Sequence, residues 1–232
     1  GVKSNGEGNS GFYVRGGGAD QNLVLLDEAP VYNASHLLGF FSTFNANAIK
    51  DVQLYKGSMP AQFGGRLASV LDIRMKDGND RKLGVSGSIG TISSNLTIEG
   101  PIKKNKASFI IAARRTYADV FLKLYSDPGI RNNKLYFYDL NAKVNVDAGP
   151  KDKLFLSGYF GRDVVGLGTT LGIDWGNATG TARWNHIYAP RWFSNTSFIF
   201  SNYNYGVAFK TDAQDFSISR SMSLSTPAFA PS

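Results

Sequence analysis

The chain has 232 residues, a net charge of +7 and a hydrophobic content of 42%, which excludes a disordered chain and allows a sizeable core. It contains no cysteine, which excludes disulfides, thiolate nucleophiles and Cys-ligated metals. The basic residues are scattered along the sequence, so no nucleic-acid-binding surface is predicted.

Residues 1–78 repeatedly join short apolar runs to glycine clusters. Such glycines supply positive φ angles or allow two backbones to approach closely. We predict short strands at 23–26, 52–55 and 69–75, a short helix or compact loop over 33–45, and a helical turn at 47–51. This first unit is therefore expected to be a small mixed α/β domain.

The ordered motifs of this unit resemble the plug domain of TonB-dependent outer-membrane receptors, most closely the Bacteroidetes type. The motifs are Val14-Arg15-Gly16-Gly17, the run 22–27, the run 49–57, and Pro60-Ala61-Gln62-Phe63-Gly64-Gly65-Arg66. The resemblance covers nearly all of residues 1–78. It implies that the sequence starts after the TonB box, so that the segment contacting the TonB energy-transducing complex is absent from this chain.

The resemblance also implies roles for individual residues. Arg15 and Arg66 match plug arginines that face wall carboxylates and hold the plug in the barrel; the alternative is that each arginine only caps a local turn. Asp27 and Glu28 are adjacent carboxylates, for which we expect solvated turn positions rather than an acid–base pair. Residues assigned to plug turn geometry are Gly16, Gly17, Asp27, Gly57, Gly64 and Gly65.

Residues 79–211 change to longer runs of alternating polarity. In the clearest, Tyr138 to Asp147, apolar residues occupy one face and polar or charged residues the other. A soluble sandwich and a membrane barrel both give this alternation. The seven expected strands are 83–91, 94–102, 107–116, 136–147, 153–163, 178–188 and 196–209.

Three features favour a transmembrane barrel. Most runs reach nine or more residues, the length that a tilted membrane strand needs. Brief turns alternate with long loops, predicted at 117–135 and 164–177. Aromatic residues lie near the strand ends, as in a membrane-interface girdle. The loss of a consistent face in 197–209 indicates a bulge or a strand leaving the membrane, and residues 212–232 stay unassigned, as a loop or the start of the next strand.

Seven strands cannot close around a plug, whereas plugged transporters have 22. The predicted fold class is thus a small mixed α/β plug domain followed by antiparallel strands of a partial 22-stranded transmembrane β-barrel. The chain would supply about a third of that barrel.

No catalytic motif is present, and neither His36 nor His186 has acidic neighbours at metal-ligand spacing. We therefore predict no enzyme activity, cofactor or metal. The resemblance implies a bacterial outer-membrane protein that imports a nutrient with energy from TonB. Its expected partners are the TonB complex, outer-membrane lipid, a small-molecule, glycan or peptide substrate, and a lipoprotein lid. The alternatives are a soluble or surface-attached β-rich ligand-binding module and a non-transporting barrel subunit of an outer-membrane assembly.

Overall fold

A computed structural model describes residues 2–4, 12–14, 21–57, 63, 68–168, 170–211, 214–216 and 228–231. Two main sheets make up this part of the chain, a four-stranded sheet in the first unit and a nine-stranded sheet in the second. Among the helices described, none is long and apolar enough to cross a membrane.

The sheet of the first unit has the strand order β4-β3-β8-β7. Its central pair, β3 and β8, is parallel, while β3–β4 and β7–β8 are antiparallel. The core lies on this pair, because their apolar side chains, such as Leu26 and Ile73, are almost fully buried. The strands of this unit are β1 (Val2–Ser4), β2 (Phe12–Val14), β3 (Asn22–Leu26), β4 (Ala29–Pro30), β5 (Ser35–His36), β6 (Phe41–Ser42), β7 (Ile49–Tyr55) and β8 (Ser69–Met75).

Of the two alternatives predicted over 33–45, the compact loop is the one that forms. Over 33–45 the chain forms a small hairpin, β5–β6, around a single 3-10 turn, η2 (Leu37–Gly39). The expected helical turn at 47–51 is a turn at 46–48, after which β7 begins at Ile49. The apolar residues of 33–45 recur at near-helical spacing because they anchor a compact loop, and periodicity cannot separate that case from a short helix.

The second unit is an antiparallel sheet in which each strand pairs with its neighbour in sequence, from β9 to β15. All seven predicted strands are present, and β12 to β15 are longer than predicted, at 14 to 20 residues. Two short helices, α1 (Ala118–Leu122) and α2 (Pro128–Arg131), lie in the predicted loop 117–135. The strands are β9 (Gly84–Ile89), β10 (Ser93–Lys103), β11 (Ala107–Thr116), β12 (Lys134–Asp147), β13 (Asp152–Leu167), β14 (Leu171–Ala189), β15 (Trp192–Thr211), β16 (Gln214–Phe216) and β17 (Ala228–Pro231).

The long loop predicted at 164–177 is wrong. β13 and β14 pair without a register shift from Asp152↔His186 to Leu167↔Leu171, so only a tight turn separates them. At least one glycine of this stretch serves packing between strands. A Cβ on Gly176 would lie 2.5 Å from the carbonyl oxygen of Gly161, a close approach that only glycine permits.

The region 197–209 contains no bulge, because β14 and β15 pair in continuous register there. The other explanation, a strand that leaves the apolar zone at Asn202 and Asn204, stays a prediction. In the segment 212–232, β16 and β17 both pair with β15, which makes them parts of the strand position that follows β15.

The two faces of the long-strand sheet differ in chemistry. On β12, Asp139, Asn141 and Lys143 are each at most 5% exposed, while Leu140 on the other face is 43% exposed. The alternation predicted for 138–147 is thus confirmed, with the polar face covered and the apolar face open. This distribution, with polar residues covered and apolar residues exposed, is the inverse of that in a soluble protein and is the one found in a membrane barrel.

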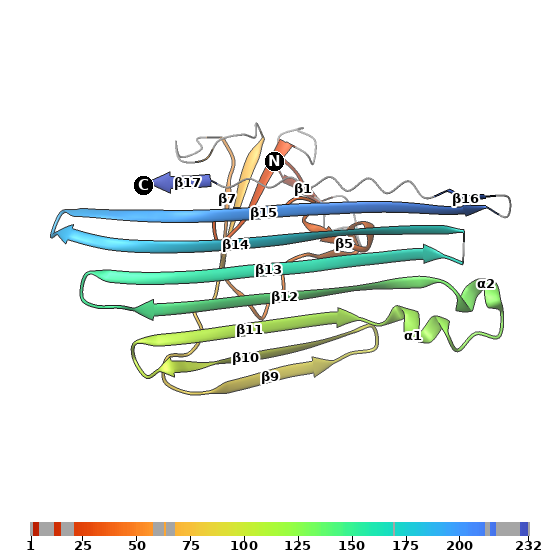
Figure 1. Cartoon of the computed structure of the whole chain (residues 1–232), viewed down its shortest axis with the longest axis horizontal. Coiled ribbons are helices and arrows are strands. Elements are labelled where there is room, and N and C mark those ends of the chain that lie inside the picture. The colour runs from red at the N-terminus through yellow and green to blue at the C-terminus, as the bar shows by residue number, and fades with distance from the viewer. Residues whose placement is uncertain are drawn as a thin grey trace.

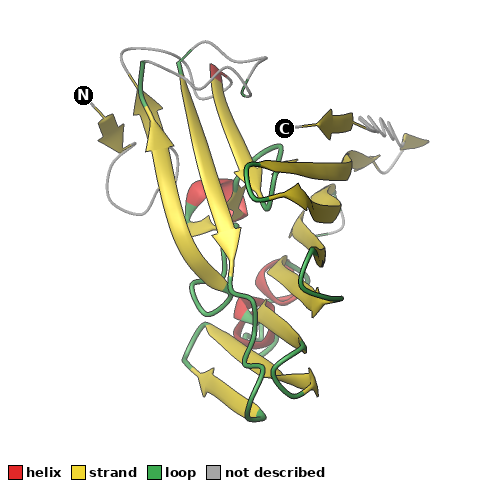
Figure 2. Cartoon of the chain, turned by 90° about the vertical axis from the view of Figure 1, so that its left-hand side faces the viewer, coloured by secondary structure: helices red, strands yellow, loops and turns green. Residues whose placement is uncertain are grey.

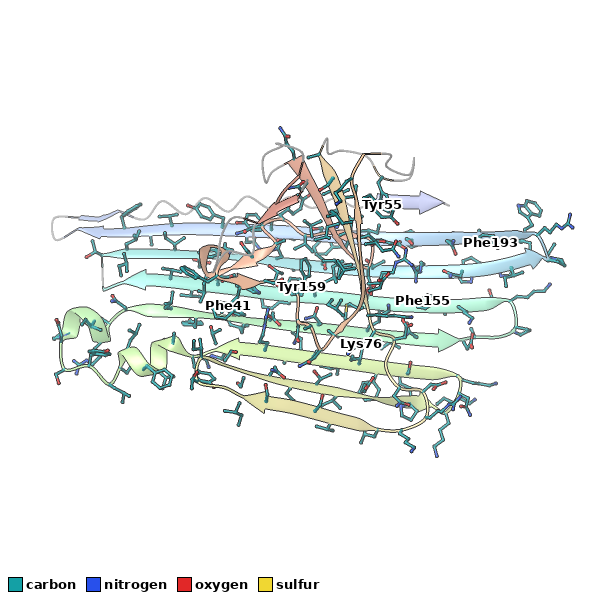
Figure 3. All side chains as sticks on the ribbon, turned by 180° about the vertical axis from the view of Figure 1, so that it is seen from behind. Phe41, Tyr55, Lys76, Phe155, Tyr159 and Phe193 are labelled. Atoms are coloured by element: carbon teal, nitrogen blue, oxygen red, sulfur yellow. The ribbon has the colours of Figure 1, made fainter. Side chains whose placement is uncertain are left out.

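The first unit covers the polar face. Figure 1 shows its strands crossing the long strands β12 to β15, and Figure 2, which looks along the long strands, shows the sheet curving around it. Tyr159 of β13 belongs to the same buried cluster as Val24, Leu26 and Ile73 of the first unit, and Figure 3 shows it beneath those strands. We call the first unit the plug and the curved sheet the wall.

Candidate functional site

The contact between plug and wall is built from charged and polar side chains. The tight turn between β3 and β4 contributes two carboxylates, Asp27 and Glu28, whose φ angles are 45° and 74°. Asp27 Oδ2 lies 3.1 Å from Lys143 Nζ, and Glu28 Oε1 lies 2.7 Å from Arg183 Nη1. The expectation that both are solvated is therefore wrong: in a turn with two positive φ angles, adjacent side chains need not point apart, and both reach the wall.

Lys143 joins the plug to the wall at several points. Its ammonium group is 3.1 Å from Asp77 Oδ1 and donates a hydrogen bond to the carbonyl of Met75, in addition to its pair with Asp27. Asp77 also pairs with Lys50 at 2.8 Å. Partial burial alone would raise the pKa of Asp77, but Lys50 and Lys143 outweigh burial and lower it. The side chain of Lys143 is only 5% exposed, so its charge depends on these partners.

A second cluster surrounds His36 at the tip of the plug hairpin. Its Nδ1 lies 2.7 Å from Asp163 Oδ2, and its Nε2 lies 3.4 Å from Asp139 Oδ2. The other oxygen of Asp163 accepts a hydrogen bond from the backbone N–H of Leu37 at 2.8 Å. Phe137 stacks on the imidazole, with ring centroids 4.0 Å apart and planes within 6°. The wall thus surrounds one plug imidazole with two carboxylates and an aromatic face.

Charge in this cluster favours the protonated histidine. Burial lowers the pKa of His36, but the hydrogen bonds and charges of Asp139 and Asp163 outweigh burial and raise it above the usual 6.5. Arg114 adds a second cation, with Nη2 2.6 Å from Asp139 Oδ2. The same guanidinium donates to the carbonyl of Ser42 in the plug at 2.8 Å. Two cations and two carboxylates therefore share one covered site.

Neutral hydrogen bonds continue the contact along the sheet. The backbone N–H of Tyr32 donates to Asn177 Oδ1 at 3.0 Å. Asn47 Nδ2 donates to Asn95 Oδ1 at 2.9 Å, and Ser201 Oγ donates to the carbonyl of Pro30 at 2.5 Å. The plug is thus held to strands from β10 to β15. A polar contact of this kind can be taken over by water, whereas an apolar one cannot.

For Arg15 and Arg66 we expected plug cations that face wall carboxylates. Most of the described ion pairs between plug and wall have the opposite arrangement. Three of the cations that reach the plug, Arg114, Lys143 and Arg183, come from the wall, and the plug contributes carboxylates and carbonyls. Among the described residues of the plug, only His36 places a cation against wall carboxylates.

Most predicted site residues lie outside the described residues. They are Arg15, Gly16, Gly17, Gly64, Gly65 and Arg66. Asp27 lies in the turn described above, and Gly57 has φ 96°. Within the part of the chain that the structure describes, no group of three His, Asp or Glu residues could hold a metal ion.

Sequence reasoning missed His36 as a contact residue. Its carboxylate partner Asp163 is 127 residues away, so no local spacing could reveal the pair. One signal was available, because Asp139 was predicted on the polar face of its strand. In a barrel that contains a plug, such a covered carboxylate needs a cation or hydrogen-bond donor from the plug.

Comparison with known proteins supports this architecture. Residues 1–70 match the model of the TonB-dependent receptor plug domain. No curated protein sequence matches the chain.

Solved structures resemble the whole chain at low identity. The siderophore receptor PirA from Pseudomonas aeruginosa is 16% identical, with a TM-score of 0.59 over 88% of this chain and 37% of its own. PirA from Acinetobacter baumannii is 12% identical, with a TM-score of 0.59 over 97% and 39%. A mutant of the ferric enterobactin receptor PfeA from Pseudomonas aeruginosa is 13% identical, with a TM-score of 0.59 over 99% and 40%.

The chain spans about two fifths of the length of these receptors. The resemblance at this identity concerns the fold, and the plug match concerns residues 1–70. TonB-dependent receptors are not enzymes and reside in the bacterial outer membrane. Residues 1–70 thus match a TonB-dependent receptor plug domain, and the chain as a whole has the fold of part of such receptors, a plug followed by an antiparallel sheet that matches part of the barrel.

Proposed function

We propose that the chain supplies the plug and the first wall strands of a TonB-dependent importer that carries a nutrient across the outer membrane. The observation that supports this most directly is the plug–wall contact. Its ion pairs and hydrogen bonds seat the plug firmly, yet each can be replaced by water when the plug moves. Substrate would bind at the outer end of the plug, and pulling by TonB would rearrange the plug to open a path.

The partners in this proposal are the TonB complex, a substrate and a lipoprotein lid. Ferric siderophores, cobalamin, glycans and peptides are the substrate classes to compare. PirA and PfeA are siderophore receptors, but a fold shared at 12–16% identity does not carry a substrate from one protein to another.

Arg15 and Arg66 remain part of the proposal as plug–wall contacts, and the complete barrel is proposed to have 22 strands. A Bacteroidetes-type receptor also remains a proposal, resting on the plug motifs alone. Substituting Arg15 and Arg66 by Gln should weaken plug docking if they face wall carboxylates, and should leave it unchanged if they cap local turns.

The test begins with the native protein in an outer-membrane fraction on a denaturing gel, with and without boiling. A closed barrel gives a band of about three times the mass of this chain or more that shifts on heating. Uptake of each substrate class is then compared in the wild type, in a strain lacking this protein and in a strain lacking TonB. Loss of the same substrate in both mutant strains supports import, and unchanged uptake of every class refutes it.

A soluble protein whose band does not shift would instead favour the ligand-binding module. A heat-shifting barrel without TonB-dependent uptake would favour the non-transporting subunit. Both outcomes contradict the proposed importer.

A further inference from the structure

Exposed cations gather at the end of the wall that carries the turns 104–106, 148–151 and 190–191. Figure 1 shows these turns at its left-hand end, opposite helices α1 and α2. None of Lys103, Lys104, Lys106 and Arg191 forms an ion pair with a described residue. The nearby acids are already engaged: Asp147 lies 3.7 Å from Lys153, and Asp152 accepts two hydrogen bonds from the wall. We call the exposed residues Lys103, Lys104, Lys106, Lys151 and Arg191 the basic rim.

A ladder of aromatic rings lies beside the basic rim. The ring centroids of Trp184 and His186 are 5.3 Å apart, those of His186 and Tyr188 4.4 Å, and those of Tyr188 and Trp192 5.4 Å. Asp152 fixes its first two members, because its Oδ1 accepts from Trp184 Nε1 at 2.8 Å and pairs with His186 Nδ1 at 2.6 Å. Rings with a polar edge concentrate where hydrocarbon meets headgroups.

The apolar band of the wall starts directly above this ladder. Trp184 pairs in register with Leu154, and the same outward face of β13 continues through Leu156 to Phe160, with 44%, 60% and 45% of these side chains exposed. Acyl chains cover such a band in an outer-membrane barrel. The cations just beyond the ladder therefore lie at the depth of lipid phosphates, and their stems can extend along the apolar surface.

We propose that the basic rim binds the phosphates of anionic phospholipids in the leaflet that faces the periplasm. In outer-membrane barrels the long loops face outward and the short turns face the periplasm. The long connection 117–133 lies at the end opposite the basic rim, which assigns the basic rim to the periplasmic leaflet. An occupant must present negative charge at the edge of an apolar layer, which an anionic phospholipid does and a soluble acidic protein does not. The surface selects lipid by charge, and the aromatic ladder keeps the cations at phosphate depth.

The test uses the intact protein reconstituted in bilayers that contain brominated phosphatidylglycerol or brominated phosphatidylcholine. Bromine quenches nearby indoles, and Trp184 and Trp192 adjoin the basic rim, whereas Trp175 is buried at 4% exposure. The signal of a Trp184→Phe/Trp192→Phe protein is subtracted, so that the remaining quenching comes from the ladder.

We expect stronger ladder quenching by brominated phosphatidylglycerol than by brominated phosphatidylcholine. Each cation near an anionic surface changes lipid affinity about fivefold, so the triple variant Lys104→Gln/Lys151→Gln/Arg191→Gln should abolish the preference. The matched control Lys123→Gln/Arg131→Gln, which removes exposed cations from the opposite end of the wall, should keep it. The heat-dependent gel shift shows that each variant has folded.

Salt provides a test without mutation, because at about 1 M the Debye length falls to roughly 3 Å. The preference of the wild type should then disappear. Equal quenching by the two lipids at low salt, or a preference that survives the triple substitution, overturns the proposal. Binding of an acidic periplasmic protein instead of lipid would also overturn it. None of these outcomes bears on the proposed import, which nutrient uptake tests separately.

Discussion

His36 has two wall carboxylates as partners, Asp139 and Asp163, and almost no access to water. Because the pKa of His36 is raised in the folded protein, its contribution to plug docking is fully present below the unfolded value of about 6.5 and is lost as the pH rises through the folded pKa. Deprotonation leaves the two carboxylates with less positive charge beside them. The plug should therefore detach more easily in alkaline solution.

This pH dependence can be measured with a dye attached to the plug. The 232 residues contain no cysteine, so Phe40→Cys, at an exposed plug position, gives a single label within this chain. The denaturant concentration that releases the plug should fall as the pH rises above about 6.5. His36→Gln should flatten this profile, while His186→Gln, in the aromatic ladder, should leave it unchanged. A flat profile in the wild type would mean that folding leaves the pKa of His36 unchanged.

Lys143 is the second residue on which docking depends. Lys143→Met keeps the length of the side chain but leaves Asp27 facing the wall without its cation, which we expect to cost about 3–5 kcal/mol of plug docking. Lys50→Met removes an exposed partner of the same Asp77 and should cost less than about 1 kcal/mol. Chemical denaturation followed by the plug dye measures both. Equal costs for the two variants would contradict a special role for Lys143.

Strand β13 positions Tyr159 by means of a neighbouring glycine. A Cβ added at Gly161 would overlap the phenol of Tyr159 and lie 3.3 Å from the imidazole of His36. Since Tyr159 is held in the plug core, Gly161→Ala should destabilise docking by about 1–3 kcal/mol. Gly180→Ala on β14 meets nothing closer than 3.9 Å and is the matched control. Melting curves of the two variants should differ, and a neutral Gly161→Ala would show that Tyr159 can move aside.

The outward face of β13 predicts where the membrane ends. Apolar residues occupy it up to Phe160, after which comes Arg162, paired with Asp174 at 2.9 Å. A spin label at Leu156 should be exposed to oxygen, and one at Val164 to a water-soluble nickel chelate. Power-saturation EPR on single-cysteine variants distinguishes the two. Oxygen exposure at both positions would place the lipid boundary beyond the Arg162 level.

At the scale of the whole molecule, the wall is an open sheet. Among the described strands, β9 pairs with β10 alone, and β15 is followed by two short strands. Unpaired edges recruit other strands, so the 232-residue chain produced alone should associate in detergent, whereas the complete barrel should stay monomeric. Light scattering after size-exclusion chromatography measures this. A stable monomer of the isolated chain would mean that its edges are protected in another way.

The sequence allowed prediction of features that show as a regular alternation of polar and apolar residues or as ordered motifs. The alternation in 138–147 identified which side chains of β12 face the plug, and it required no knowledge of the partner. The region 164–177 could not be predicted in the same way, because Gly176 suggests a loop unless the close approach of Gly161 is known. The contacts of Asp27 and Glu28 with the wall depend on two positive φ angles, and those of His36 depend on partners more than a hundred residues away. Contacts between distant segments leave no local trace in the sequence.

The position of Tyr159 constrains how the protein is assembled. A side chain from the wall completes the hydrophobic core of the plug, so the plug alone would have a gap where the phenol belongs, at a cost of a few kcal/mol. The plug is synthesised first but cannot reach its final packing until β13 arrives. We therefore expect the plug to remain incompletely packed until the wall strands form around it.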